Sequence, residues 1–190
     1  MRNILILLVI TSFAISGCSR IVYKTTSDKP VGTDASERSF GRYIDDELIE
    51  TYVGANLLKA DPDYKLFNIN VVSFNGIVLL TGQVKSDQLL SGASNIAKQV
   101  RNVRRVHNEL TVSGPISLPA RTNDTWLKTK IKSRMLTSKT LSPLKVKVVV
   151  ENGVVYLMGL VNQSEAQESV EIAHKTYGVQ KIVKVFEYVN

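Results

Sequence analysis

The sequence predicts an α+β fold built from two copies of one αββαβ unit, and three observations carry this prediction. Two Asn-Gly pairs, Asn75-Gly76 and Asn152-Gly153, each join alternating apolar runs, NVVSFNGIVLLTGQV and KVVVENGVVYLMGLV. An amphipathic segment precedes each pair, DDELIETYVGANLL and then NDTWLKTKIKSRML. A β-branched run, VHNELTV or IVKVFEYV, closes each copy. Such self-similarity at a fixed period indicates a tandem repeat.

The chain opens with an export signal. Arg2 precedes an unbroken apolar run, and small residues then lead to Cys18, a pattern too short for a membrane-spanning helix. The stretch Ile15-Ser16-Gly17-Cys18 resembles a bacterial lipobox. It implies a signal peptide over residues 1–17 and a covalent lipid on Cys18, with no other cofactor expected. An ordinary signal peptide that contains a cysteine is the alternative.

The resemblance to lipoproteins also implies a destination. Ser19, not Asp, follows the cysteine, which implies delivery to the outer membrane on its periplasmic side, although surface exposure stays open. Residues 18–43 are polar and patternless, so we expect a lipidated tether with a reach of roughly 25–30 Å. The formal charge of +7 suggests an anionic partner, and an exported chain meets phospholipid more often than nucleic acid.

Each copy predicts the same order of elements. A helix led by acidic and Asx residues comes first, with Asp45 and Asp46 in one copy and Asn123 and Asp124 in the other. Two strands follow, joined at Asn-Gly as a hairpin. Gly82 and Gly159 are expected to end or bend the second strand of each pair.

A second helix and a last strand complete each unit. The helix has apolar spacing at Leu89, Ala93, Ile96, Ala97 and Val100 in the first copy, and at Ala166, Val170, Ala173 and Tyr177 in the second. We expect both helices on one face of a three-stranded mixed sheet. The first domain covers residues 44–113 and the second 123–190, with a linker at 114–122.

This pattern resembles the BON domain. An Asp-led helix, NG(I/V)V.L.G.V, IA....V..V and a closing strand carry the resemblance. Two such domains behind a lipobox resemble the dual-BON outer-membrane lipoproteins of Gram-negative bacteria, the DolP type. The resemblance implies phospholipid binding, a role in envelope integrity and accumulation at division sites.

The first helix of the second copy is the candidate phospholipid-binding element. On a helical wheel Leu127, Ile131 and Met135 cluster on one side and are expected to face the sheet. A tryptophan among cations suits a membrane interface. The candidate contact residues fall away from the sheet side or on its flanks: Trp126, Lys128, Lys130, Lys132, Ser133, Arg134 and Leu136. The alternative is that Trp126 staples the helix to a loop or a neighbouring domain.

The equivalent helix of the first copy carries the opposite charge. It keeps inward apolar positions but presents Asp45, Asp46, Glu47 and Glu50, a face that anionic lipid would repel. A protein adaptor that binds envelope proteins through this acidic helix, or through exposed sheet faces, is therefore the second hypothesis. It predicts that changing Asp46 and Glu50 impairs function more than changing Trp126. Attraction between the two helices themselves is a third explanation of the contrast.

The sheet faces away from the helices are also apolar. Leu79, Val72, Val149, Tyr156 and Met158 point that way, as do Val183 and Val185. A sheet face that is open to solvent would carry polar residues at these alternate positions. We expect the two sheets to pack on each other, with a docked partner as the rival interpretation.

Other function classes have no support in the sequence. Nothing matches a Walker loop, HExxH or GxSxG, and neither His107 nor His174 has a metal-ligating neighbour at the usual spacing. No two glycines are three residues apart, which excludes the GxxG loop that KH domains use for nucleic acid. We therefore expect no catalysis, no metal, no small-molecule substrate and no nucleic-acid binding.

Overall fold

The computed structural model describes residues 39–114, 117–142 and 144–189. The predicted signal peptide, the lipidated Cys18 and most of the expected tether lie outside this range. The first unit consists of α3 (Phe40–Ala60), α4 (Asp63–Leu66), β1 (Ile69–Phe74), β2 (Ile77–Val84), α5 (Asp87–Lys98) and β3 (Arg105–Val112). The second consists of α6 (Leu118–Leu136), β4 (Val146–Glu151), β5 (Val154–Val161), α7 (Gln163–His174) and β6 (Lys181–Tyr188).

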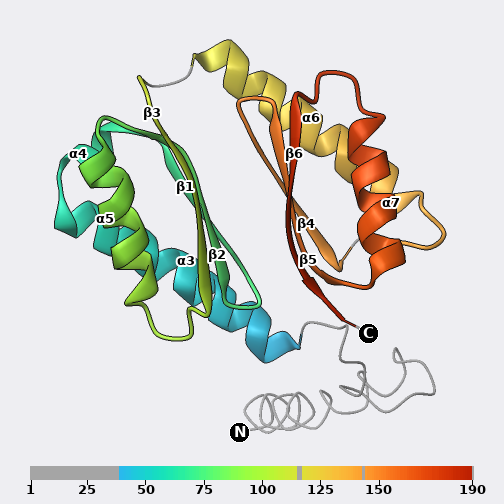
Figure 1. Cartoon of the computed structure of the whole chain (residues 1–190), viewed down its shortest axis with the longest axis horizontal. Coiled ribbons are helices and arrows are strands. Elements are labelled where there is room, and N and C mark those ends of the chain that lie inside the picture. The colour runs from blue at the N-terminus through green and yellow to red at the C-terminus, as the bar shows by residue number, and fades with distance from the viewer. Residues whose placement is uncertain (1–38, 115–116, 143, 190) are drawn as a thin grey trace, which may run out of the picture. The chain divides into compact units, whose positions relative to one another are not determined.

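Each unit contains one three-stranded mixed sheet (Figure 1). In the first, β2 lies between an antiparallel β1 and a parallel β3. In the second, β5 lies between an antiparallel β4 and a parallel β6. Two long helices pack on each sheet, and the predicted α+β fold with two αββαβ repeats is confirmed. The short helix α4 is an addition that the sequence pattern did not predict.

The Asn-Gly hairpins form as predicted. Asn75 and Gly76 have φ of 53° and 74°, and Asn152 and Gly153 have φ of 48° and 74°. Two successive residues with positive φ define the turn whose twist matches that of paired strands. Asparagine and glycine reach this conformation at lower cost than other residues, so the sequence fixes both turns.

Gly82 and Gly159 do not end their strands. β2 and β5 continue past them to Val84 and Val161. A Cβ at Gly82 would collide with the carbonyl oxygen of Asn68, and one at Gly159 with that of Lys145. The glycines therefore permit a close backbone approach where the chain enters the preceding strand.

Both opening helices begin earlier than predicted. α3 starts at Phe40, where the Ser39 hydroxyl accepts a hydrogen bond from the Arg42 N–H at 3.3 Å. α6 starts at Leu118, so its first turn takes in part of the expected linker. Asp46 and Asp124 consequently lie inside the helices rather than at their ends. At the other end of the second unit, α7 stops at His174, so Tyr177 is not on its apolar face.

Three apolar clusters hold this part of the chain together. One lies between α3, α5 and the first sheet, and a second lies between α6, α7 and the second sheet. The third joins the opposite faces of both sheets: Val72, Phe74, Ile77, Leu79, Val149, Tyr156, Met158, Leu160 and Val185. The prediction that the sheets pack on each other is confirmed. The rival interpretation, an exposed sheet face open to a partner, is wrong because these side chains cover one another.

Polar contacts border this sheet-on-sheet cluster. The Arg104 guanidinium donates to Glu187 at 2.9 Å, and the Gln83 amide donates to Glu151 at 2.8 Å. The Lys147 ammonium pairs with Glu50 at 2.8 Å. Each contact joins one residue from each unit, so the two repeats share a polar rim as well as an apolar centre.

Candidate functional site

The outward side of α6 is the central feature of the candidate site. Leu127 and Ile131 are 0% exposed and Met135 is 1% exposed, so the wheel prediction of a sheet-facing side is confirmed. We call the opposite side the outer α6 face and define it by Trp126, Lys130, Ser133 and Leu136. Trp126 is 48% exposed and Leu136 is 68% exposed. An apolar ring and an isobutyl group thus face solvent on a helix whose other side is fully packed.

A cation lies directly over the tryptophan. The Lys130 Nζ is 4.3 Å from the centre of the Trp126 ring. The ring quadrupole attracts an ammonium at this distance, and the contact orders both side chains. This pair combines an amphipathic aromatic with a positive charge in one small area.

Two buried carboxylates fix the opening helices against the hairpins. Asp124 accepts hydrogen bonds from the backbone N–H groups of Asn152 at 2.7 Å and Gly153 at 2.8 Å. Asp46 does the same for Asn75 and Gly76, each at 2.8 Å. The sequence indicated a helix start at these acids. Their actual role is to hold each Asn-Gly turn onto the helix before it, which sets the position of the outer α6 face.

One flank of α6 concentrates positive charge. Lys128 and Lys132 are both exposed, and Lys147 of β4 lies close enough to affect Lys128. Partial burial, followed by repulsion from Lys132 and Lys147, lowers the pKa of Lys128. The ion pair of Lys147 with Glu50 offsets only part of this repulsion.

Arg134, on the other flank, has a structural role. Its guanidinium donates to the Lys175 carbonyl oxygen at 2.7 Å and to the Thr176 hydroxyl at 3.0 Å. It thereby binds the end of α7 to α6 and is half-buried. Among the seven residues that the sequence indicated for lipid contact, Arg134 is therefore committed to holding α7 in place.

The loop after α6 adds one more exposed apolar side chain. Leu144 is 90% exposed. The Ser138 hydroxyl donates to Glu168 at 2.5 Å, and this hydrogen bond, with a second from Thr140, lowers the pKa of Glu168. Lys145 pairs with Glu165 at 2.9 Å. These contacts tie the loop to α7 on both sides of Leu144.

The corresponding side of α3 in the first unit is less acidic than the sequence suggests. Asp46 is 1% exposed, and Glu50 accepts a hydrogen bond from the Ser73 N–H at 2.8 Å besides pairing with Lys147. Both carboxylates therefore serve the fold. Of the other two acids near the start of α3, Glu47 is exposed and Asp45 is half-buried.

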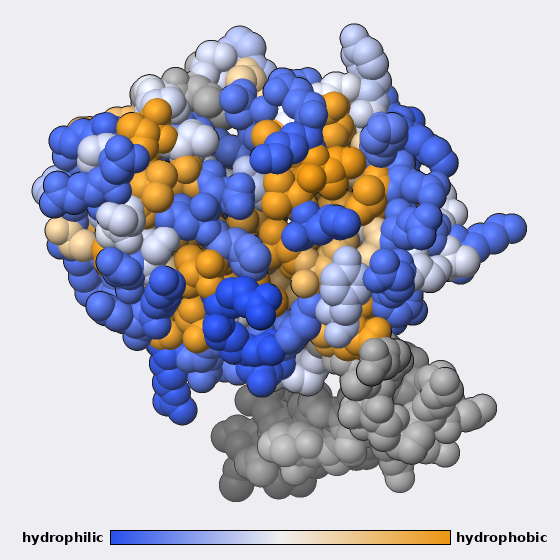
Figure 2. Space-filling view, viewed as in Figure 1, coloured by the Kyte–Doolittle hydropathy of each residue, from blue (hydrophilic) through white to orange (hydrophobic). Residues whose placement is uncertain are grey.

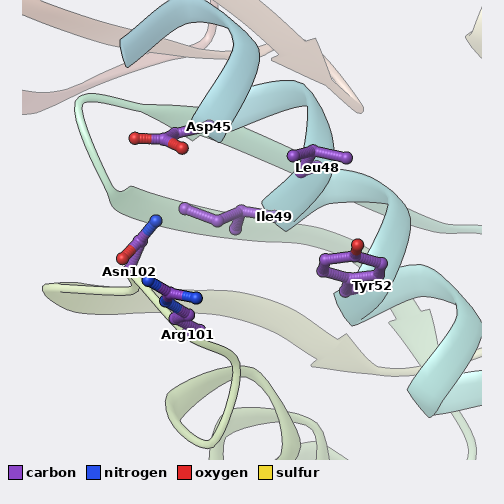
Figure 3. A pocket seen from close by; sticks show the side chains of 6 residues that line it. All are labelled: Asp45, Leu48, Ile49, Tyr52, Arg101 and Asn102. Atoms are coloured by element: carbon purple, nitrogen blue, oxygen red, sulfur yellow. The ribbon is translucent and has the colours of Figure 1, made fainter. Parts of the chain in front are cut away.

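A shallow groove runs beside α3 (Figure 3). Its volume is about 260 Å³, and Leu48 and Tyr52 contribute exposed apolar surface to it. Arg101 and Asn102, from the turn after α5, form the other side. Counting through the repeat, Leu48 occupies the place of Trp126 and Tyr52 that of Lys130. The same location thus has a basic, aromatic character in one unit and a more apolar one in the other.

Other exposed large apolar side chains in the described ranges include Phe40, Leu66 and Tyr188. On the face shown in Figure 2, apolar patches lie between hydrophilic side chains, and the widest of these patches is right of the centre. Among the helices of the described ranges, none has the length and hydropathy needed to cross a bilayer.

The comparisons with known proteins agree with the repeat. Residues 45–114 and 123–190 each match the BON domain family. The chain is 40% identical to the outer membrane lipoprotein DolP of Haemophilus influenzae, over 100% of this chain and 97% of that one. It is 36% identical to a 21 kDa hemolysin of Actinobacillus pleuropneumoniae, covering 80% and 79% of the two chains. It is 30% identical to the osmotically-inducible protein Y of Escherichia coli, covering 78% and 75%.

Proposed function

The chain belongs to the BON-domain family, and from this premise we propose that it is a lipid-anchored protein of the outer membrane that binds anionic phospholipid through the outer α6 face. The likeness to an outer membrane lipoprotein extends over the whole chain. It supports an envelope role on the periplasmic side, with Cys18 as the lipidated residue. Support of envelope integrity, with enrichment at division sites, is part of this proposal, and the role is not enzymatic.

The single observation that carries the proposal is the Trp126–Lys130 pair on a helix with a packed inner side. Trp126 is half exposed although it is large and apolar, and Leu136 is exposed on the same face. A helix of this kind lies in the plane of a membrane interface, with its aromatic ring at the headgroup level. Each cation near an anionic surface contributes about 1 kcal/mol to the free energy of membrane binding. Lys128, Lys130 and Lys132 therefore add to the binding free energy from burying Trp126 and Leu136 in the membrane.

The tether makes a weak affinity sufficient. A lipid on Cys18 would hold the folded part near the membrane, within the reach expected for residues 18–43. An intramolecular second contact has a high effective concentration, so the outer α6 face needs only modest intrinsic affinity. The fraction of time that the second unit is bound to the membrane would then depend on the local content of anionic lipid.

The test is vesicle co-sedimentation of the unlipidated mature chain, residues 18–190 with Cys18→Ser. We expect binding to vesicles containing phosphatidylglycerol and little binding to purely zwitterionic vesicles, with a loss of binding as salt is raised. Trp126→Ala and the double variant Lys130→Glu/Lys132→Glu should both release the protein. The matched control Lys59→Glu/Lys65→Glu makes the same charge change on exposed lysines of the first unit and should bind as wild type does.

Wild type that stays in the supernatant with phosphatidylglycerol vesicles would contradict the proposal. Equal release by the first-unit control would also contradict it, because net charge rather than the outer α6 face would then govern binding.

A second candidate function, a protein adaptor, is favoured by the groove beside α3. Leu48 and Tyr52 are exposed there without a cation on the helix between them. The acidic helix is not the right target for a test, because Asp46 and Glu50 hold the fold together. The double variant Leu48→Ser/Tyr52→Ser should impair envelope function while leaving vesicle binding intact if an envelope protein docks in this groove. Unchanged function in cells would exclude the adaptor role of this surface.

A further inference from the structure

A second exposed aromatic residue of this unit is held on a turn whose neighbouring residues contact α6. Tyr177, in the turn between α7 and β6, is 88% exposed. Helical spacing in the sequence suggested that it faces the core, but α7 ends three residues earlier. An aromatic ring left almost entirely in water forgoes the free energy that burying it would contribute, so this ring adds little to the stability of the fold.

The turn that carries Tyr177 is fixed to α6 on both sides. Before it, the Arg134 guanidinium donates to the Lys175 carbonyl oxygen at 2.7 Å and to the Thr176 hydroxyl at 3.0 Å. After it, Gly178 has a φ of 97°, and a Cβ there would lie 3.2 Å from Leu127 Cδ2. The exposed ring is therefore attached to a stretch that packs along the same helix as Trp126.

The repeat shows where on α6 this turn lies. Arg101 and Asn102 of the first unit occupy the places of Tyr177 and Gly178, and both Asn102 and Gly178 have positive φ. In the first unit these residues form one side of the groove, with Leu48 and Tyr52 of α3 on the other (Figure 3). By the same correspondence, we infer that Tyr177 lies across from Trp126 and Lys130.

The two units exchange residue types at this place. The first has a tyrosine on the helix, Tyr52, and a cation on the turn, Arg101. The second has the cation on the helix, Lys130, and the tyrosine on the turn. The exchange brings two exposed aromatic rings, Trp126 and Tyr177, to adjoining elements of the second unit only.

We propose that Tyr177 is a second membrane anchor that inserts at the lipid headgroup level together with Trp126. The inference rests on the proposed function and extends its site from one helix to an adjoining turn. Tyrosine suits this level because its ring is apolar and its hydroxyl stays hydrated. A helix held at one row of residues can roll about its axis, whereas a second contact beside the axis restrains that roll. Tyr177 would thus set the orientation of the second unit on the membrane.

The experiment uses the mature chain with Cys18→Ser, which contains no other cysteine. Tyr177→Cys, labelled with an environment-sensitive fluorophore, reports the surroundings of this position while Trp126 stays in place. Tyr52→Cys is the matched control, because it labels an exposed tyrosine on α3, the corresponding helix of the first unit. With phosphatidylglycerol vesicles we expect a blue shift of the label at 177 and no shift at 52.

A second measurement uses unlabelled variants. Tyr177→Ala should weaken partition into phosphatidylglycerol vesicles about fivefold, from loss of the apolar area of one ring. Tyr177→Phe should keep most of the binding, and Tyr52→Ala should bind as wild type does. Circular dichroism of Tyr177→Ala should be unchanged because the ring has no packing role.

The outcomes separate this inference from the proposed function. A label at 177 that stays water-exposed on protein that sediments with vesicles, or Tyr177→Ala that binds as wild type does, overturns the second anchor alone. A wild-type chain that fails to sediment with phosphatidylglycerol vesicles overturns the proposed function and this extension together.

Discussion

Replacing Asp46 with alanine should destabilise the protein far more than replacing the adjacent Asp45. The Asp46 carboxylate is 1% exposed and accepts hydrogen bonds from the Ser73 hydroxyl at 2.7 Å and from the backbone N–H groups of Asn75 and Gly76 at 2.8 Å each. A buried donor that loses its acceptor costs about 1–3 kcal/mol. Because the turn adjusts and the serine hydroxyl can rotate, we expect a total loss of about 3–5 kcal/mol in the free energy of unfolding.

The assay is urea unfolding of the mature chain followed by circular dichroism. Asp45→Ala is the matched control, because this neighbouring acid is only half-buried whereas Asp46 is fully buried, and it should change the free energy of unfolding by less than about 1 kcal/mol. Asp46→Asn should fall between the two, since the amide keeps one acceptor oxygen. If Asp46→Ala costs no more than Asp45→Ala, the carboxylate does not hold the hairpin turn and our account of how the opening helices are positioned is wrong.

Three further predictions concern packing, titration and the contact between repeats. Leu127→Ala should cost about 2–5 kcal/mol in urea unfolding because Leu127 is fully buried, whereas Leu136→Ala on the exposed face should change stability by under about 0.5 kcal/mol. The hydrogen bond from Arg104 lowers the pKa of Glu187 in the folded protein. The Arg104–Glu187 pair therefore stabilises the fold fully above the unfolded-state pKa of about 4.3, and this contribution is lost as pH falls through the lower folded-state pKa. Glu187→Gln should therefore lower the free energy of unfolding at neutral pH and make it decrease less steeply below about pH 4. If the decrease in acid is as steep as in wild type, the Arg104–Glu187 pair contributes nothing to stability. Leu79→Asp, which puts a charge into the cluster between the sheets, should raise the radius of gyration in small-angle X-ray scattering, whereas Leu66→Asp on an exposed site should not.

The fold was predictable from the sequence because its main signals are local. Asn75-Gly76 and Asn152-Gly153 fix two hairpins through backbone conformations that asparagine and glycine adopt at lower cost than other residues. The apolar spacing of Leu127, Ile131 and Met135 identifies the packed side of α6. Apolar residues on both faces of each sheet likewise predicted the sheet-on-sheet cluster. The hairpins and the packed side of α6 follow from neighbours along the chain, and the sheet-on-sheet cluster follows from apolar faces that must be covered.

The details of the candidate site were less predictable because they depend on contacts between distant segments. An acid near the start of an amphipathic run usually marks a helix terminus, yet Asp46 and Asp124 reach hairpins about thirty residues further along the chain. The sequence predicts Arg134 to be a surface cation, whereas in the structure its guanidinium donates hydrogen bonds to Lys175 and Thr176. Tyr177 fitted the period of α7, and only the helix end at His174 shows that it is exposed.

The charge contrast between the two opening helices is smaller in the structure than in the sequence. In the first unit Asp46 holds a turn and Glu50 pairs with Lys147, so neither forms part of a free acidic surface. What remains different is the outward row, with Leu48 and Tyr52 in one copy and Trp126 and Lys130 in the other. Aligning the repeats residue by residue would have revealed this difference, because it isolates the positions that the shared fold leaves free.

The most direct test of the central claim uses Trp126 as its own probe, because it is the only tryptophan in the chain. Its fluorescence would be measured as vesicles are added to the unlipidated mature chain, with brominated acyl chains as quenchers. Our account predicts a blue shift and quenching with phosphatidylglycerol vesicles and neither change with zwitterionic vesicles. An unchanged Trp126 spectrum on protein that demonstrably sediments with phosphatidylglycerol vesicles would contradict it, because the membrane contact would then lie elsewhere on the molecule.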